Sequence, residues 1–183
     1  MKRNLKLAVF IFFALVSVFY RLIPFKLPNV EFLSSLIAFT LLSYDKKVAL
    51  SIIPLLVVIS DVLLNVVLHI PFDFRWEVIV IFGWLLVILT QYMLRGKKVL
   101  NVVIMEIVGT LVFYFITNSL VFFVFNFYPK TIAGYISCML AGLPFLRNQA
   151  LFNFAFSFIV FVTVNELGFG KEVSKEFLSN ENA

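Results

Sequence analysis

Polar side chains recur every four residues in three otherwise apolar stretches, and this spacing could build a site inside a membrane. Asp61, Asn65 and His69 share one face of a helix, because residues four apart lie one above the other. Such groups are costly within a membrane span and by default face the bundle interior or a water-filled cavity. The same spacing joins Glu106, Thr110, Tyr114 and Asn118, and it begins again at Asn153 and Ser157.

Several polar groups fall in the predicted outer half of the membrane. They are Asn65, His69, Asn118, Asn148 and Asn153, with Arg75, Lys130 and Arg147 close by in sequence. Amides and cations that converge at one depth favour a small-molecule binding site near the outer face. The alternative is that these side chains only join helix to helix, at roughly 0.6 kcal/mol per contact.

Two carboxylates lie deeper. Asp61 is a candidate for proton or sodium coupling, as in secondary transporters, and a structural pairing is the alternative. For Glu106, a hydrogen bond to a neighbouring hydroxyl or amide is favoured over a relay role.

The sequence gives little support for catalysis or for a bound cofactor. One Cys and one His give no constellation for a transition metal. Ser60 and His69 stand nine residues apart on one predicted helix, about 13 Å, beyond hydrogen-bond reach. No nucleophile motif or phosphate-binding glycine loop is present. We therefore expect a protein that is not an enzyme and that carries neither a metal nor a cofactor.

The composition is that of an integral membrane protein. Hydrophobic residues make up 62% of the 183 residues and charged residues only 14%, against roughly 25% in soluble proteins. The mean hydropathy is +1.05. The net charge of +5 arises from short basic clusters between apolar runs. This pattern indicates a lipid bilayer and no nucleic-acid partner.

The elements that position these groups are predicted to be helices in one transmembrane domain, residues 1–183. A span needs about 20 apolar residues. The predicted fold is all-α, with six transmembrane helices and a short outer-face helix over 131–145. The six spans are predicted at 5–23, 30–44, 48–70, 76–94, 99–127 and 149–168.

The segment 131–145 has about 15 residues and carries Pro144, so we expect it to lie at the outer face rather than to cross. Gly134, Cys138 and Gly142 repeat every four residues, which favours close packing onto the bundle. Tyr128 and Tyr135 would then be free to cover a ligand.

The distribution of basic residues predicts the orientation. With six spans and both termini in the cytoplasm, ten of the 15 Lys and Arg residues face inward. The expected location is the bacterial inner membrane, with multiple passes. The apolar start of the chain continues through Arg21 without a small-residue cleavage site, so it is interpreted as a retained first span.

Three sequence runs resemble a known group of transporters. They are RLIPFKLPN after the first span, SDVLLNVVLH at the end of the third, and the long run from TNSLVFFVFNFYPK to LPFLRNQALFNFAF. The pattern looks like a family of small bacterial membrane proteins of unassigned function, similar to the substrate-binding S components of energy-coupling factor (ECF) vitamin transporters.

This resemblance implies a six-helix carrier for vitamin uptake, which binds a vitamin-like substrate from outside and works with an ECF coupling subunit and two ATPases. Cobalamin, or another large and weakly charged vitamin, is the ligand that the amides and aromatics suggest. By analogy the site would be lined or braced by Asn118, Tyr128, Lys130, Thr131, Pro144, Arg147 and Asn148, with Arg21 and Asn29 from the first loop.

Two other hypotheses remain. One is a stand-alone secondary transporter that uses Asp61 for proton coupling. The other is a structural membrane subunit without a ligand, in which the polar stripes only hold the helices together.

Overall fold

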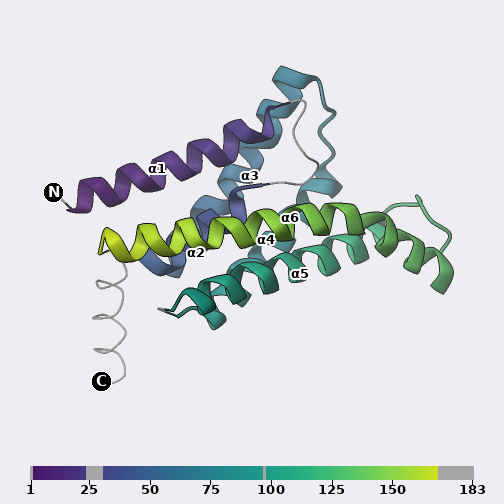
Figure 1. The fold of residues 1–183 in the computed structure, drawn as a ribbon. Coiled ribbons are helices and arrows are strands. Elements are labelled where there is room, and N and C mark those ends of the chain that lie inside the picture. The colour runs from purple at the N-terminus through teal and green to yellow at the C-terminus, as the bar shows by residue number, and fades with distance from the viewer. Residues whose placement is uncertain (1, 24–30, 97, 169–183) are drawn as a thin grey trace.

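The computed structural model describes residues 2–23, 31–96 and 98–168. These residues form six helices, as Figure 1 shows: α1 (Lys2–Arg21), α2 (Leu33–Ser43), α3 (Lys46–Leu68), α4 (Phe74–Leu94), α5 (Val99–Val124) and α6 (Ile132–Glu166). All except α2 are long and apolar enough to cross a membrane. The prediction of an all-α polytopic membrane protein is confirmed at this level, whereas the number and bounds of the spans differ.

Helix α2 is too short for the span predicted at 30–44. Its 11 residues extend about 16 Å, roughly half of a hydrocarbon core about 30 Å thick. Every residue of α2 is buried, and α2 packs against each of the other five helices. An apolar segment surrounded by protein need not match the bilayer thickness, which explains why hydropathy alone suggested a crossing. Helix α2 therefore lies at the centre of the bundle.

The predicted outer helix and the predicted sixth span form one helix. Helix α6 runs unbroken for 35 residues with Pro144 inside it, a length of about 52 Å. The prediction treated Pro144 as a stop. A proline inside a membrane helix is tolerated when neighbouring groups satisfy the freed backbone, so Pro144 does not separate the segment 131–145 from the segment predicted as the sixth span. Figure 1 shows α6 lying along α5 and extending past it.

The small residues of α6 pack against α5, whereas the sequence predicted close packing onto the bundle without naming a partner helix. Gly134, Cys138 and Gly142 are buried, whereas their neighbours Ala133 and Ala141 are exposed. A methyl group on Gly142 would lie 2.7 Å from Asn118 Oδ1 and 2.8 Å from Tyr114 Cε2. The Tyr114 hydroxyl donates to the Met139 carbonyl across the same contact, at 2.5 Å.

The two ends of the bundle differ. Segments 69–73 and 125–131 connect helices at one end, hereafter the 69–73 end. The start of α1 and the end of α6 both lie at the opposite end (Figure 1). Asp73 caps α4 by accepting from the Arg75 backbone N–H at 2.9 Å. A side-chain hydrogen bond from Arg75 lowers the pKa of Asp73 below its usual value.

Candidate binding cavity and its polar network

A cavity of about 380 Å³ lies between α4, α5 and α6 in the half of the bundle toward the 69–73 end. This volume is within the range of roughly 300–1,000 Å³ that holds small ligands. Five aromatic side chains line the cavity: Trp76, Trp84, Phe113, Tyr114 and Phe145. The polar lining consists of Arg21, Glu31, Thr110, Thr117, Asn118 and Gln149.

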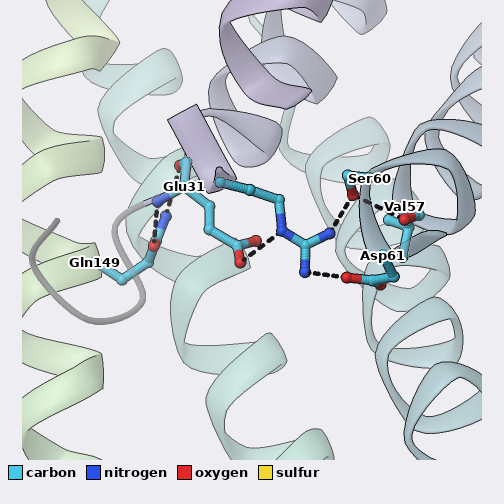
Figure 2. Close-up of polar contacts among 6 residues, drawn as sticks. Glu31, Val57, Ser60, Asp61 and Gln149 are labelled. Atoms are coloured by element: carbon cyan, nitrogen blue, oxygen red, sulfur yellow. Dashed lines mark hydrogen bonds and ion pairs between the residues drawn. The ribbon is translucent and has the colours of Figure 1, made fainter. Parts of the chain in front are cut away.

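Arg21, the last residue of α1, is the centre of an ion cluster at one side of the cavity. Its guanidinium lies 2.6 Å from Asp61 Oδ1 and 3.5 Å from Glu31 Oε1, and it also donates to the Ser60 hydroxyl. Figure 2 shows Glu31 on one side of this guanidinium and Ser60 and Asp61 on the other. The cluster therefore ties α1 and the segment before α2 to α3.

Gln149 connects this cluster to α6. Its amide oxygen accepts from the Glu31 backbone N–H at 3.0 Å, and its amide nitrogen donates to the Glu31 carbonyl at 3.0 Å (Figure 2). Gln149 also donates to Asn153 Oδ1 at 3.0 Å. Asn153, which is fully buried, donates to the Thr110 hydroxyl at 2.8 Å. The polar contacts thus continue from the cavity toward the bundle centre.

A second polar group lies one helical turn beyond Thr110, where α2 meets α4 and α5. Ser34 donates to Glu106 Oε2 at 2.5 Å and accepts from the Gln91 amide at 3.0 Å. Glu106 and Gln91 have no exposed surface. No salt bridge among the described residues joins Glu106 to a cation. Gly109 lets Gln91 approach α5, since a methyl group there would lie 2.9 Å from Gln91 Nε2.

Some buried polar atoms in this region have no hydrogen-bond partner in the part of the chain that the structure describes. Trp84 Nε1 and Glu77 Oε2 lie near the cavity, and Gln91 Oε1 and Glu106 Oε1 lie beyond Thr110. Trp84 is only 3% exposed although it lines the cavity. Buried polar groups are normally paired, so Trp84 Nε1 is an exception within the described residues, and it lies beneath the cavity surface rather than on it.

Comparison with protein families matches residues 1–173 to DUF6580, a family of unknown function. The chain belongs to the DUF6580 family. No curated protein matches it, and no solved structure matches it. The resemblance of this DUF6580 protein to ECF S components therefore depends on the sequence motifs alone.

The structure brings four of the predicted site residues of this DUF6580 protein together. Arg21 and Asn118 line the cavity. Asp61 does not line the cavity but forms an ion pair with the lining residue Arg21. Asn153 likewise donates a hydrogen bond to the lining residue Thr110. Asn118 is held in place because its amide nitrogen donates to the Tyr114 carbonyl at 2.8 Å.

Two further predicted site residues have structural contacts at helix ends. Lys130 donates its ammonium to the carbonyls of Phe122 and Phe125, where α5 ends. Thr131 caps α6 by accepting from the Gly134 N–H at 3.1 Å. Lys130 and Thr131 also line a shallower hollow with Phe122 and Tyr135, separate from the cavity.

The remaining predicted residues do not line the cavity. Asn65, His69 and Arg147 are exposed, and Tyr128 and Asn148 are half-buried. Asn65 donates to the Ile70 carbonyl at 3.0 Å. Asn29 falls outside the described residues. The predicted depth of a residue in the membrane did not show whether it lines the cavity, because residues at the same depth can face different sides of their helices.

Sequence reasoning missed several lining residues of the DUF6580 cavity. Gln149 was placed only as the start of a span, and Glu31 was not proposed as a binding residue. Trp76 and Trp84, eight residues apart, face the cavity from α4. Their spacing of about two turns was a usable signal. The Thr110, Tyr114 and Asn118 stripe was recognised as polar, and all three residues line the cavity.

Proposed function

We propose that this protein is the substrate-binding membrane subunit of an uptake system for a vitamin or similar micronutrient, comparable to an ECF S component. The observation that carries the proposal is the aromatic cavity of about 380 Å³, with polar groups from several helices, inside a bundle of membrane helices. Apolar cavities with a few convergent polar groups are the usual form of small-molecule sites. Energy for release would come from a coupling subunit and ATPases.

The cavity volume changes the expected ligand. At about 380 Å³ the cavity lies near the lower end of the range that holds drug-sized molecules, roughly 300–1,000 Å³. Cobalamin, which carries a corrin macrocycle and a nucleotide tail, is larger than such a molecule. The proposed ligand is therefore a vitamin with one or two rings.

A thermal-shift screen of the detergent-solubilised protein tests this proposal. The panel contains B vitamins, cobamides, queuosine and nucleobases. A ligand at 100 times its dissociation constant stabilises the folded state by about 2.7 kcal/mol. We expect at least one compound to raise the transition temperature, and we expect Asn118→Ala to abolish that rise, because Asn118 lines the cavity.

Arg147→Ala is the matched control for Asn118→Ala. Arg147 is exposed and its guanidinium contacts Asn148 at 3.5 Å, so its removal should leave ligand stabilisation unchanged. A screen without any hit on well-folded protein contradicts the proposal and favours a structural subunit. Equal loss of ligand stabilisation in Asn118→Ala and Arg147→Ala would contradict the assignment of the cavity as the binding site.

A second candidate is a stand-alone proton-coupled secondary transporter. The observation that favours it is the contact of Asp61 with Arg21 at the cavity wall, because intramembrane carboxylates paired with cations occur in proton pathways. This candidate predicts that Asp61→Asn abolishes uptake in cells. It also predicts that a protonophore blocks uptake while ATP depletion does not, which is opposite to an ATPase-driven system.

A further inference from the structure

We infer that the cavity selects an organic cation, a planar positively charged molecule. This inference rests on the proposed function, whose ligand class it narrows. Two observations support it: a surplus of carboxylates around Arg21 and the aromatic lining.

The charges beside the cavity do not balance within the described residues. Arg21 is one cation, and it pairs with Asp61 at 2.6 Å and Glu31 at 3.5 Å. Two carboxylates thus surround one guanidinium.

The helix dipole does not remove this surplus. Glu31 lies just before α2, whose N-terminus carries the equivalent of about half a positive charge. Adding this half charge to Arg21 still leaves the carboxylates in excess. Asp61 is the nearest carboxylate to the guanidinium, whereas Glu31 lies farther from it and lines the cavity. Glu31 is therefore the carboxylate that a bound cation would meet.

The aromatic lining suits the same kind of ligand. Trp76, Trp84, Phe113, Tyr114 and Phe145 line one cavity. The faces of aromatic rings carry negative potential and attract cations, most strongly where water is excluded. Flat rings also stack on a planar ligand. An anion would face these rings and Glu31, and the Arg21 guanidinium that lines the same cavity is already paired with Asp61 and Glu31, so the cavity disfavours an anion.

Three compounds that share one ring but differ in charge test the inference. 1-Methylnicotinamide, which is methylated on the ring nitrogen, is a cation, nicotinamide is neutral and nicotinate is an anion. Their dissociation constants for the detergent-solubilised full chain are measured by calorimetric titration at one pH and salt concentration. We expect the cation to bind at least ~10-fold more tightly than nicotinamide, equivalent to about 1.4 kcal/mol. Nicotinate should bind most weakly.

Glu31→Gln is the diagnostic variant, since it removes the charge and keeps the shape of the side chain. It should weaken the binding of 1-methylnicotinamide about 10-fold and leave the binding of nicotinamide unchanged, which also shows that the variant is folded. Glu166→Gln is the control, because it makes the same carboxylate-to-amide change at an exposed position at the far end of α6.

Each outcome of this experiment decides the inference. Tighter binding of nicotinamide or nicotinate, equal binding of all three, or no binding of the cation at millimolar concentration overturns it. A hit for a neutral or anionic vitamin in the broader screen would leave the proposed function standing while the cation inference fails. A screen without hits together with no binding of any isostere would defeat both.

Discussion

At the scale of single residues, Glu106 shows how a carboxyl group can be held in the middle of a membrane bundle. It is fully buried, accepts from Ser34 and has no cation bonded to it within the described ranges. Burying a charge without a partner is costly. The hydrogen bonds around Glu106 therefore need its oxygen acceptor and do not depend on a negative charge.

Substitution of Glu106 tests this account. Glu106→Gln keeps an oxygen for Ser34 and should change the unfolding free energy by less than about 1 kcal/mol. Glu106→Ala leaves the Ser34 hydroxyl without its acceptor and should destabilise by about 1–3 kcal/mol. Thermal unfolding of the purified protein in detergent measures both. If Glu106→Gln lowers the unfolding free energy as much as Glu106→Ala does, then the charged carboxylate itself stabilises this region.

At the scale of the helices, the close contact between α5 and α6 depends on glycine. Gly142→Ala would place a methyl group under 3.0 Å from Asn118 and Tyr114. Overpacking costs about 1–3 kcal/mol, whereas the gain in helix propensity is at most about 1 kcal/mol. We expect net destabilisation in thermal unfolding, together with weaker ligand binding, because Asn118 is displaced.

Ala141→Val is the control for this change, since Ala141 is the exposed neighbour on the same turn. It should leave unfolding and ligand binding almost unchanged. Stabilisation by Gly142→Ala would mean that α5 and α6 separate easily at this point.

The helices also show what the sequence could and could not predict. Hydropathy and length predicted the long spans, since lipid selects apolar residues over the full bilayer depth. The same rule misjudged α2, because an apolar run surrounded by protein looks like one surrounded by lipid. The small-residue repeat of Gly134, Cys138 and Gly142 was interpreted correctly, because close packing needs small side chains whether or not the helix continues past Pro144.

The site was only partly predictable for a related reason. Periodicity identifies the polar face of one helix, and it found Thr110, Tyr114 and Asn118. It does not show which helices face each other. The contacts of Arg21 with Asp61 and of Gln149 with Glu31 join residues far apart in the chain. Lys130 and Thr131 make short-range contacts at helix ends. From the sequence alone, a polar residue in a loop that caps a helix looks the same as one that binds a ligand.

At the scale of the whole molecule, the polar contacts connect every helix. Arg21 joins α1 to α3, Gln149 joins α6 to the segment before α2, and Asn153 joins α6 to α5. Ser34 then joins α2 to α4 and α5. Individual contacts in membranes are weak, at roughly 0.6 kcal/mol, so this connectivity fixes how the helices are arranged more than how stable they are.

The orientation in the membrane is a prediction at this scale. Basic residues near Lys47 and Lys98 place the 69–73 end outside. In a Cys138→Ala background, a membrane-impermeant maleimide should label Asn126→Cys in intact cells. It should label Lys47→Cys only after permeabilisation. Both positions are exposed. The reverse pattern would place the cavity toward the cytoplasm and would contradict uptake from outside.

The short central helix has an electrical consequence. Where water fills the cavity, the aqueous phase reaches well into the bundle, and the remaining insulating layer is the thin region around α2 and Glu106. The membrane voltage then falls across a shorter distance, which strengthens the local field. One elementary charge crossing 100 mV changes its energy by about 2.3 kcal/mol. A charge moving through the α2 layer would therefore experience most of the membrane potential.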